Sequence, residues 1–210
     1  MAYLIIGIDV GLSGGITIIE EGKTPIIHKM PLKKIIVNKK NKNTYDMNSI
    51  VDIFKEHQGK KVLYCVEKQG VRPGEGSVSA MTIGKGFGQL LGVGHAFEFD
   101  VSIILPTTWK KSYSYLEENG VSDIRIKIKK KMLYGKTLED KEQKKENKKY
   151  VEKMQRDLKS QAKTNARLLA AMLYPDMAHK FEKKNTDGIA ESLLIALYGK
   201  DNQDELVQNG

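Results

Sequence analysis

The chain has 210 residues, 40% of them hydrophobic, which is enough to bury one sizeable core, and we therefore expect a single domain. No stretch reaches the roughly 18 consecutive apolar residues of a membrane-spanning helix, so the composition excludes a transmembrane protein. The N-terminal residues show no basic leader and the single Cys65 has no partner for a disulfide; these features predict an intracellular, cytoplasmic protein. The formal net charge of +9 fits either an anionic partner or a solubility margin.

Short runs of β-branched residues predict a sheet in the first part of the chain. Residues 3–8 and 16–19 flank a Gly-Gly pair and predict a hairpin, and residues 25–30 predict a third strand. Residues 37–43 are rich in Lys and Asn, which is typical of a polar loop.

The rest of the chain alternates helical and strand patterns. The predicted elements are a helix over residues 47–58, a buried strand over 61–67, a loop over 70–76, a helix over 77–95, a strand over 99–105, a short turn containing Trp109, and helices over 161–173 and 187–198. This order predicts a mixed α/β domain over residues 1–200 with one sheet. Residues 201–210 are polar and predict a disordered tail.

Five glycines lie within the helix predicted over residues 77–95. Glycine inside a helix costs up to about 1 kcal/mol relative to alanine. Their repetition indicates the close approach of another backbone, from protein or nucleic acid. The glycines are Gly84, Gly86, Gly88, Gly92 and Gly94.

The positive charge is concentrated in one segment. Between Lys110 and Arg167 there are 18 Lys or Arg and 9 Asp or Glu, so this segment accounts for the whole surplus of the chain. Residues 138–149 mix both signs, and a solvated helix is the favoured interpretation there. Residues 125–131 and 153–167 are more purely basic and are better candidates for phosphate contacts. We expect a basic helical insertion over about residues 112–160.

Acidic residues stand at the ends of predicted elements. Asp9 ends an apolar strand, and Glu67 ends the buried strand before the Gly-rich loop. If these two strands are neighbours, both carboxylates emerge at one edge of the sheet. Asp187 and Glu191 are four residues apart and share one helical face. Four oxygen donors without a competing His or Cys cluster suit Mg²⁺ or Mn²⁺. Each acid also has a structural explanation as a turn, an ion pair or a helix N-terminus.

Taken together, four segments resemble one family. GIDVGLSGG, the strand YCVEKQ, LPTTWKK and TDGIAESLLIALYG are similar to the RuvC-type Holliday junction resolvases of the ribonuclease H-like superfamily, particularly their phage-type branch. The resemblance spans residues 4–199 and is weakest over residues 112–160. It implies an α/β fold with a ribonuclease H-like mixed five-stranded sheet flanked by helices.

The resemblance also implies a chemistry. Asp9, Glu67, Asp187 and Glu191 would bind two Mg²⁺ ions, with Mn²⁺ as a substitute, and a homodimer would cut a four-way or related branched DNA junction. The nicks would carry 5′-phosphate and 3′-hydroxyl ends. Two features depart from familiar bacterial members. The last acidic pair is spaced by four and ends in Glu191, and residues 69–72 have no aromatic wedge to open the junction.

Basic residues near these motifs are the candidates for DNA contacts. Trp109 itself is expected to be a core anchor, and the four dispersed histidines offer no metal-ligand spacing. The candidate DNA-binding residues are Arg72, Lys85, Lys110, Lys111, Lys127, Lys129 and Lys130.

Two other functions remain open from the residues alone. The Gly7 to Gly15 segment also begins actin-like and sugar-kinase-like phosphotransferases, but that fold needs a duplicated domain for which 210 residues leave no room. A non-catalytic nucleic-acid-binding module would use the basic insertion and would not need the four carboxylates.

Overall fold

The computed structural model describes residues 3–70, 75–118 and 120–208. The strands are β1 (Leu4–Asp9), β2 (Gly15–Ile19), β3 (Ile26–Lys29), β4 (Leu32–Val37), β5 (Lys40–Tyr45), β6 (Val62–Glu67) and β7 (Asp100–Ile104). The helices are α1 (Met47–Lys55), α2 (Ser77–Ala96), α3 (Pro106–Lys111), α4 (Val121–Thr137), α5 (Lys141–Leu173), α6 (Asp187–Asp201) and α7 (Gln203–Gln208). Over these described ranges, no helix combines the length and the apolar character that crossing a bilayer requires.

The main sheet has five strands in the order β3-β2-β1-β6-β7. β1 pairs with β2 in antiparallel fashion and with β6 in parallel, and β7 runs parallel to β6. Since β1 and β6 are parallel neighbours, Asp9 and Glu67 reach the same carboxyl edge. The condition for the two acids to meet, that their strands are neighbours, is fulfilled, and the mixed five-stranded sheet that the resemblance implies is confirmed.

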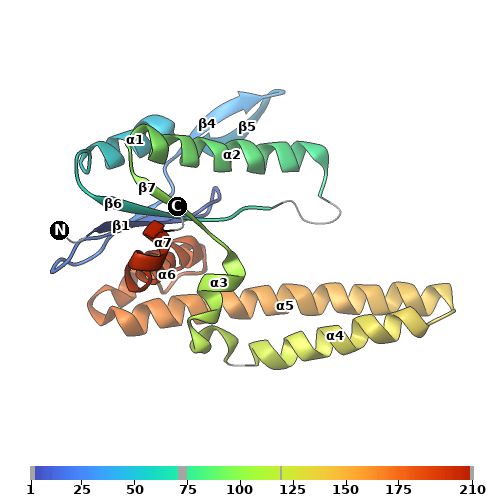
Figure 1. The fold of residues 1–210 in the computed structure, drawn as a ribbon. Coiled ribbons are helices and arrows are strands. Elements are labelled where there is room, and N and C mark those ends of the chain that lie inside the picture. Colours follow the sequence, from blue (N-terminus) through green and yellow to red (C-terminus); the bar gives the residue numbers. More distant parts are fainter. Residues whose placement is uncertain (1–2, 71–74, 119, 209–210) are drawn as a thin grey trace.

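Helices cover both faces of this sheet (Figure 1). On one face Ile6, Tyr64 and Leu90 belong to the core under α1 and α2. On the other, Ile5 and Leu63 belong to the core under α5 and α6. Alternate residues of β1 and β6 thus enter opposite cores, which explains why both strands are apolar throughout.

Helix α6 lies directly on β1 and β2. A Cβ atom at Gly7 would stand 2.6 Å from Ala196 Cβ, and one at Gly15 would stand 2.9 Å from Gly188 O. The Thr17 and Ser192 hydroxyls form a buried 2.8 Å hydrogen bond between β2 and α6. The absence of side chains at these glycines lets α6 come close to the strand that ends in Asp9.

Two predictions about polar segments are wrong. Residues 37–43, predicted as a loop, contain the turn and inner parts of the β4–β5 hairpin, in which Asn38 and Lys39 take positive φ angles of 52° and 61°. The hairpin is exposed on both sides along most of its length, so it lacks the apolar alternation that marks a strand. Of the tail predicted as disordered, residues 203–208 form α7, because Leu206 and Val207 pack against the core under α6, and residues 209–210 lie outside the described residues.

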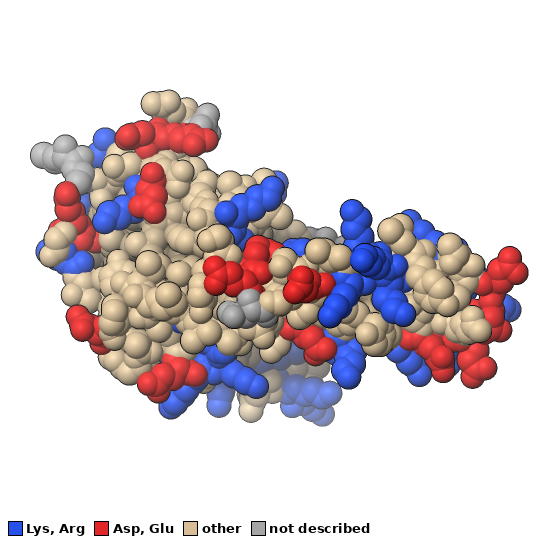
Figure 2. Space-filling model, turned by 90° about the horizontal axis from the view of Figure 1, so that it is seen from below, with Lys and Arg blue, Asp and Glu red and all other residues tan. Residues whose placement is uncertain are grey.

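The segment predicted as a basic insertion folds as a two-helix arm, made of α4 and the outer part of α5, that projects from the body (Figure 1). A small core of Ile128, Val151 and Met154 joins the two helices. At the root, the Asn165 amide donates to the carbonyls of three residues before α4, at 3.0 to 3.4 Å. Figure 2 shows the underside, where Lys and Arg side chains gather along the arm and acidic ones at its outer end.

The glycines of α2 divide into two groups. A Cβ atom at Gly86 would meet the Tyr45 ring at 2.6 Å, and one at Gly94 would meet the Tyr64 ring at 2.9 Å. These neighbours are aromatic side chains, so the predicted approach of another backbone is wrong at these two positions. Gly84, Gly88 and Gly92 face open space within the described structure.

Candidate active site

Three of the four predicted acids line one cleft. Asp9 stands at the end of β1, Glu67 at the end of β6, and Glu191 on the first turns of α6, which lies against β1. The cleft has a volume of about 490 Å³ and is also lined by Lys110, at the end of α3. These three residues therefore lie together at the sheet edge, as the sequence leads us to expect.

Glu67 is held by two side chains. Its Oε1 accepts a 3.0 Å hydrogen bond from Trp109 Nε1, and its Oε2 accepts one of 3.3 Å from Gln69 Nε2. Trp109 is fully buried, as expected of a core anchor, and its indole also orients the carboxylate. The 8% exposed Glu67 has its pKa raised by burial, while Lys110 opposes this shift.

Asp9 is the most destabilised carboxylate of the cleft. Burial raises its pKa well above the usual value, and the negative charges of Glu191 and Glu67 raise it further. Lys110 and Lys163 act in the opposite direction. An ionised Asp9 is therefore costly unless another positive charge approaches it.

Lys110 supplies positive charge within the cluster. Its Nζ lies 3.2 Å from Glu191 Oε1 and 4.8 Å from the centre of the Trp109 ring. Burial lowers the Lys110 pKa, but Glu191 and Glu67 outweigh this, so the net shift is upward and the amine stays charged. The predicted phosphate-binding lysine is thus a counter-ion of the acids in this structure.

Asp187 is not part of this cluster. Its Oδ2 lies 3.2 Å from Lys163 Nζ, and its Oδ1 lies 3.4 Å from Arg167 Nε, so both partners come from α5. Asp187 begins α6 one turn before Glu191, as its spacing predicts. However, its carboxylate is engaged by α5 and does not line the cleft.

The other predicted DNA-binding residues are spread over the surface. Lys85 is exposed on α2 and lines a hollow of about 240 Å³ that shares Val10 and Gln69 with the cleft. Lys111 is exposed on α3. Arg72 lies outside the described residues.

The three predicted lysines of the arm do not line the cleft. Lys127 and Lys130 line a hollow on one side of the arm with Tyr134 and Tyr150. Lys129 is exposed and is two residues from Lys127, so the helical period places it on another face of α4. Their DNA-binding role stays a prediction.

Two cleft residues were missed. Lys159 and Lys163, one turn apart on α5, line the cleft opposite the strand ends. The available signal was their spacing together with Ala162 and Ala166, because small residues let the helix approach the sheet edge. The sequence predicts phosphate contacts for residues 153–167 as a whole, without distinguishing these two lysines.

The donor set suits a hard divalent cation. Asp9, Glu67 and Glu191 offer oxygen atoms, which Mg²⁺ and Mn²⁺ prefer, and the Asp9 pKa is raised by burial and then by the negative charges of Glu191 and Glu67. Over the described ranges, no three Asp, Glu, His or Cys side chains stand close enough to form a ready-made ligand cluster. The acids thus fit a cation by chemistry, while Lys110 contributes the nearest positive charge.

The fold of this chain matches that of a known structural class. The chain has the RuvC-like, ribonuclease H-like fold, since it aligns with Thermus thermophilus RuvC solved in complex with a Holliday junction substrate, at a TM-score of 0.51 and 11% identity. That alignment covers 97% of this chain and 96% of the other. Another T. thermophilus RuvC structure aligns at a TM-score of 0.45 and 13% identity, over 96% of each chain. No protein-family model and no curated protein matches the chain.

Proposed function

We propose that this protein is a structure-selective DNA endonuclease of the phage-type RuvC branch that cuts four-way or related branched junctions by metal-dependent phosphodiester hydrolysis. The observation that supports this most strongly is the cleft itself. Three carboxylates from β1, β6 and α6 share it with Lys110, Lys159 and Lys163. A non-catalytic DNA-binding module has no need for a cleft in which burial and neighbouring carboxylates raise the pKa values of Asp9 and Glu67.

Asp9, Glu67 and Glu191 are the residues that would hold divalent cations, two per site, with Mg²⁺ as the natural ion and Mn²⁺ as a substitute. Bound there, such ions polarise the scissile phosphate and lower the pKa of a water. Trp109 keeps the Glu67 carboxylate facing the cleft. Asp187 would join the set only after leaving Lys163 and Arg167.

The lysines around the acids would bind the phosphates. Lys159 and Lys163 extend from α5 into the cleft, where they can neutralise the strand that is cut. Lys110 can exchange its contact with Glu191 for a phosphate oxygen once other positive charge neutralises the carboxylates. The products would be 5′-phosphate and 3′-hydroxyl ends, and two symmetric cuts would require a homodimer.

A cleavage assay tests this proposal. Four-way, Y-shaped and linear duplex DNA are incubated with the protein in Mg²⁺ or Mn²⁺, and end-labelled products are mapped. We expect paired nicks in the branched substrates, and none with Asp9→Asn, while junction binding persists. Lys23→Ala, far from the cleft and paired with Glu20 at 2.8 Å, is the control and should cut at the wild-type rate. Equal cutting of linear duplex, or full activity of Asp9→Asn, would refute the proposal.

A further inference from the structure

The two lysines that α5 contributes to the cleft belong to a longer row. The residues that follow one another on this face at intervals of three or four are Lys163, Lys159, Arg156, Glu152, Lys148, Lys145 and Lys141. Because an α-helix has 3.6 residues per turn, these intervals keep all seven on one side along its length. We name this row the α5 basic stripe; it holds six basic residues and one acid.

The acids of α5 avoid this stripe. Glu142, Glu146 and Asp157 lie on other faces by the same period, and only Glu152 interrupts the row. Three of the four acids of α5 therefore lie off this face, whereas lysines such as Lys149 and Lys153 also occur on the other faces. Residues 138–149, which the sequence favours as an ordinary solvated helix, thus contribute three lysines to one face.

The outer stripe is exposed and has no acidic partner. All seven side chains are exposed. In the described part of the chain, no Asp or Glu lies within ion-pair distance of Lys141, Lys145, Lys148, Arg156 or Lys159, whereas Lys163 pairs with Asp187. Unpaired like charges in a row repel one another, which favours a polyanion as the partner.

The arm holds the stripe at a fixed position. The Asn147 amide donates to Lys131 O at 3.0 Å near the outer end, and the buried Asn165 amide ties the root to the segment before α4. Between them lies the small core that joins α4 and α5. The stripe begins in the cleft and continues outward on the arm, which leaves the body on the same side as the first turns of α2 (Figure 1).

We infer that the α5 basic stripe binds the backbone of a duplex that leaves the active site, and so measures the length of a DNA arm. This deepens the proposed function and rests on it. At 1.5 Å per residue, Lys141 lies about 33 Å from Lys163 along the helix. At 3.4 Å per base pair, that distance corresponds to about 10 base pairs of duplex beyond the cut. Contacts of this kind are to phosphates and carry no sequence preference.

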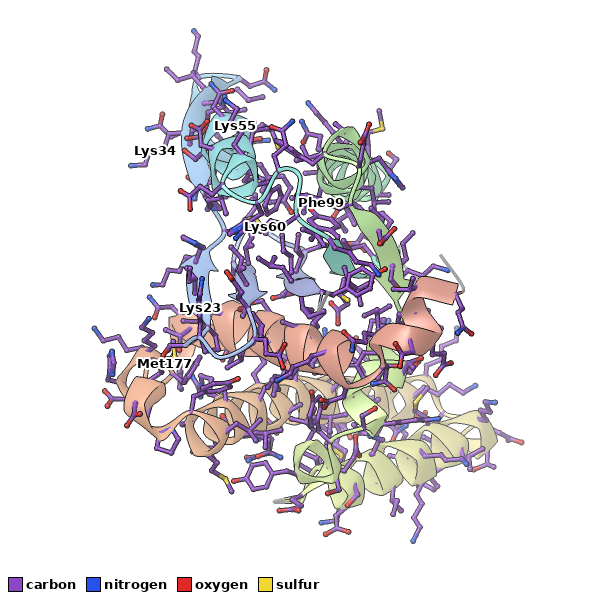
Figure 3. The ribbon with its side chains drawn as sticks, turned by 60° about the vertical axis from the view of Figure 1, so that its left-hand side comes forward. Lys23, Lys34, Lys55, Lys60, Phe99 and Met177 are labelled. Atoms are coloured by element: carbon purple, nitrogen blue, oxygen red, sulfur yellow. The ribbon has the colours of Figure 1, made fainter. Side chains whose placement is uncertain are left out.

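Junctions of two arm lengths test the inference. The variant Lys141→Ala/Lys145→Ala/Lys148→Ala removes the outer charges, which lie about 22 to 33 Å, or roughly 7 to 10 base pairs, from Lys163. The matched control Lys23→Ala/Lys55→Ala/Lys60→Ala removes three surface lysines, which are labelled in Figure 3. Binding without metal is measured over a salt series, on four-way junctions with loop-closed arms of about 6 or about 20 base pairs.

On long arms we expect the outer triple variant to lower the slope of log affinity against log salt by about two to three units, and to weaken binding roughly tenfold. On short arms it should match the wild type, and the control should match it on both. Wild-type behaviour of the outer triple on long arms, or an equal loss on both lengths, would overturn the inference. The proposed function fails separately, if the wild type cuts no branched substrate.

Discussion

The seating of α6 on β1 decides whether the cleft exists, and Gly7 tests it. In Gly7→Ala the new methyl would stand 2.5 Å from Ser192 O and 2.6 Å from Ala196 Cβ, and distances below 3.0 Å do not occur between real Cβ atoms and their neighbours. Helix and strand must separate, at a cost of about 3 kcal/mol. For a chain of this size, that lowers the melting temperature by roughly 6 to 12 °C.

Gly92→Ala is the matched control for Gly7→Ala. Within the described structure no atom would meet its methyl group, so the gain in helix propensity, about 1 kcal/mol, should raise the melting temperature by roughly 2 to 4 °C. Thermal unfolding followed by circular dichroism measures both variants. Gly7→Ala should also lose junction cleavage, because moving α6 moves Glu191 away from Asp9. A Gly7→Ala protein as stable as the wild type would show that α6 does not contact β1 as described.

Four further predictions concern single side chains. Asp9→Asn removes a charge that desolvation, Glu191 and Glu67 disfavour. The metal-free variant should therefore be about 1 kcal/mol more stable at pH 7.5 but lose the Mg²⁺-induced rise in melting temperature, and an unchanged rise would contradict this prediction. Because the folded state raises the Asp9 pKa, this acid contributes stability below pH 3.8 that disappears as the pH rises. The stability of Asp9→Asn relative to the wild type should therefore grow from pH 3.5 to pH 8. A stability difference that is constant over this range would refute the raised pKa as its cause. Trp109→Phe removes the donor to Glu67 and should slow cleavage with a stability loss of about 1 to 2 kcal/mol, and wild-type cleavage would exclude a positioning role. Asn165→Ala removes the side-chain amide that ties α5 to the segment before α4. It should cost about 1 to 3 kcal/mol and speed tryptic cleavage of the arm, and unchanged proteolysis would mean that the root is held otherwise.

The sheet was predictable because its strands are apolar on both sides. β6 is buried along its whole length and β1 up to Ile8, and that continuity is visible in the residues. The β4–β5 hairpin was not, since its side chains face solvent on both sides and its turn uses Asn38 and Lys39 rather than a glycine. Helix α7 was missed because Leu206 and Val207 become apolar contacts only once the core is in place.

The sequence predicts which carboxylates supply oxygen donors to the site, but it does not predict which charged side chains contact them. Asp9 and Glu67 end parallel neighbouring strands, so their meeting follows from local pattern and sheet order. Lys110 and Glu191 are 81 residues apart and make contact only because α3 and α6 flank the same edge.

The ion pairs of Asp187 could not be predicted from the sequence either, and they bear on function. Its spacing from Glu191 predicts a shared face, yet Lys163 and Arg167 of α5 neutralise it. Lys163 is also the innermost member of the α5 basic stripe. A phosphate that draws Lys163 away would remove one of the two cations that hold the Asp187 carboxylate, and Arg167 would also have to release it before it could turn toward the cleft. DNA binding along α5 and completion of the acidic site are therefore coupled, because a DNA phosphate and the Asp187 carboxylate compete for the Lys163 amine.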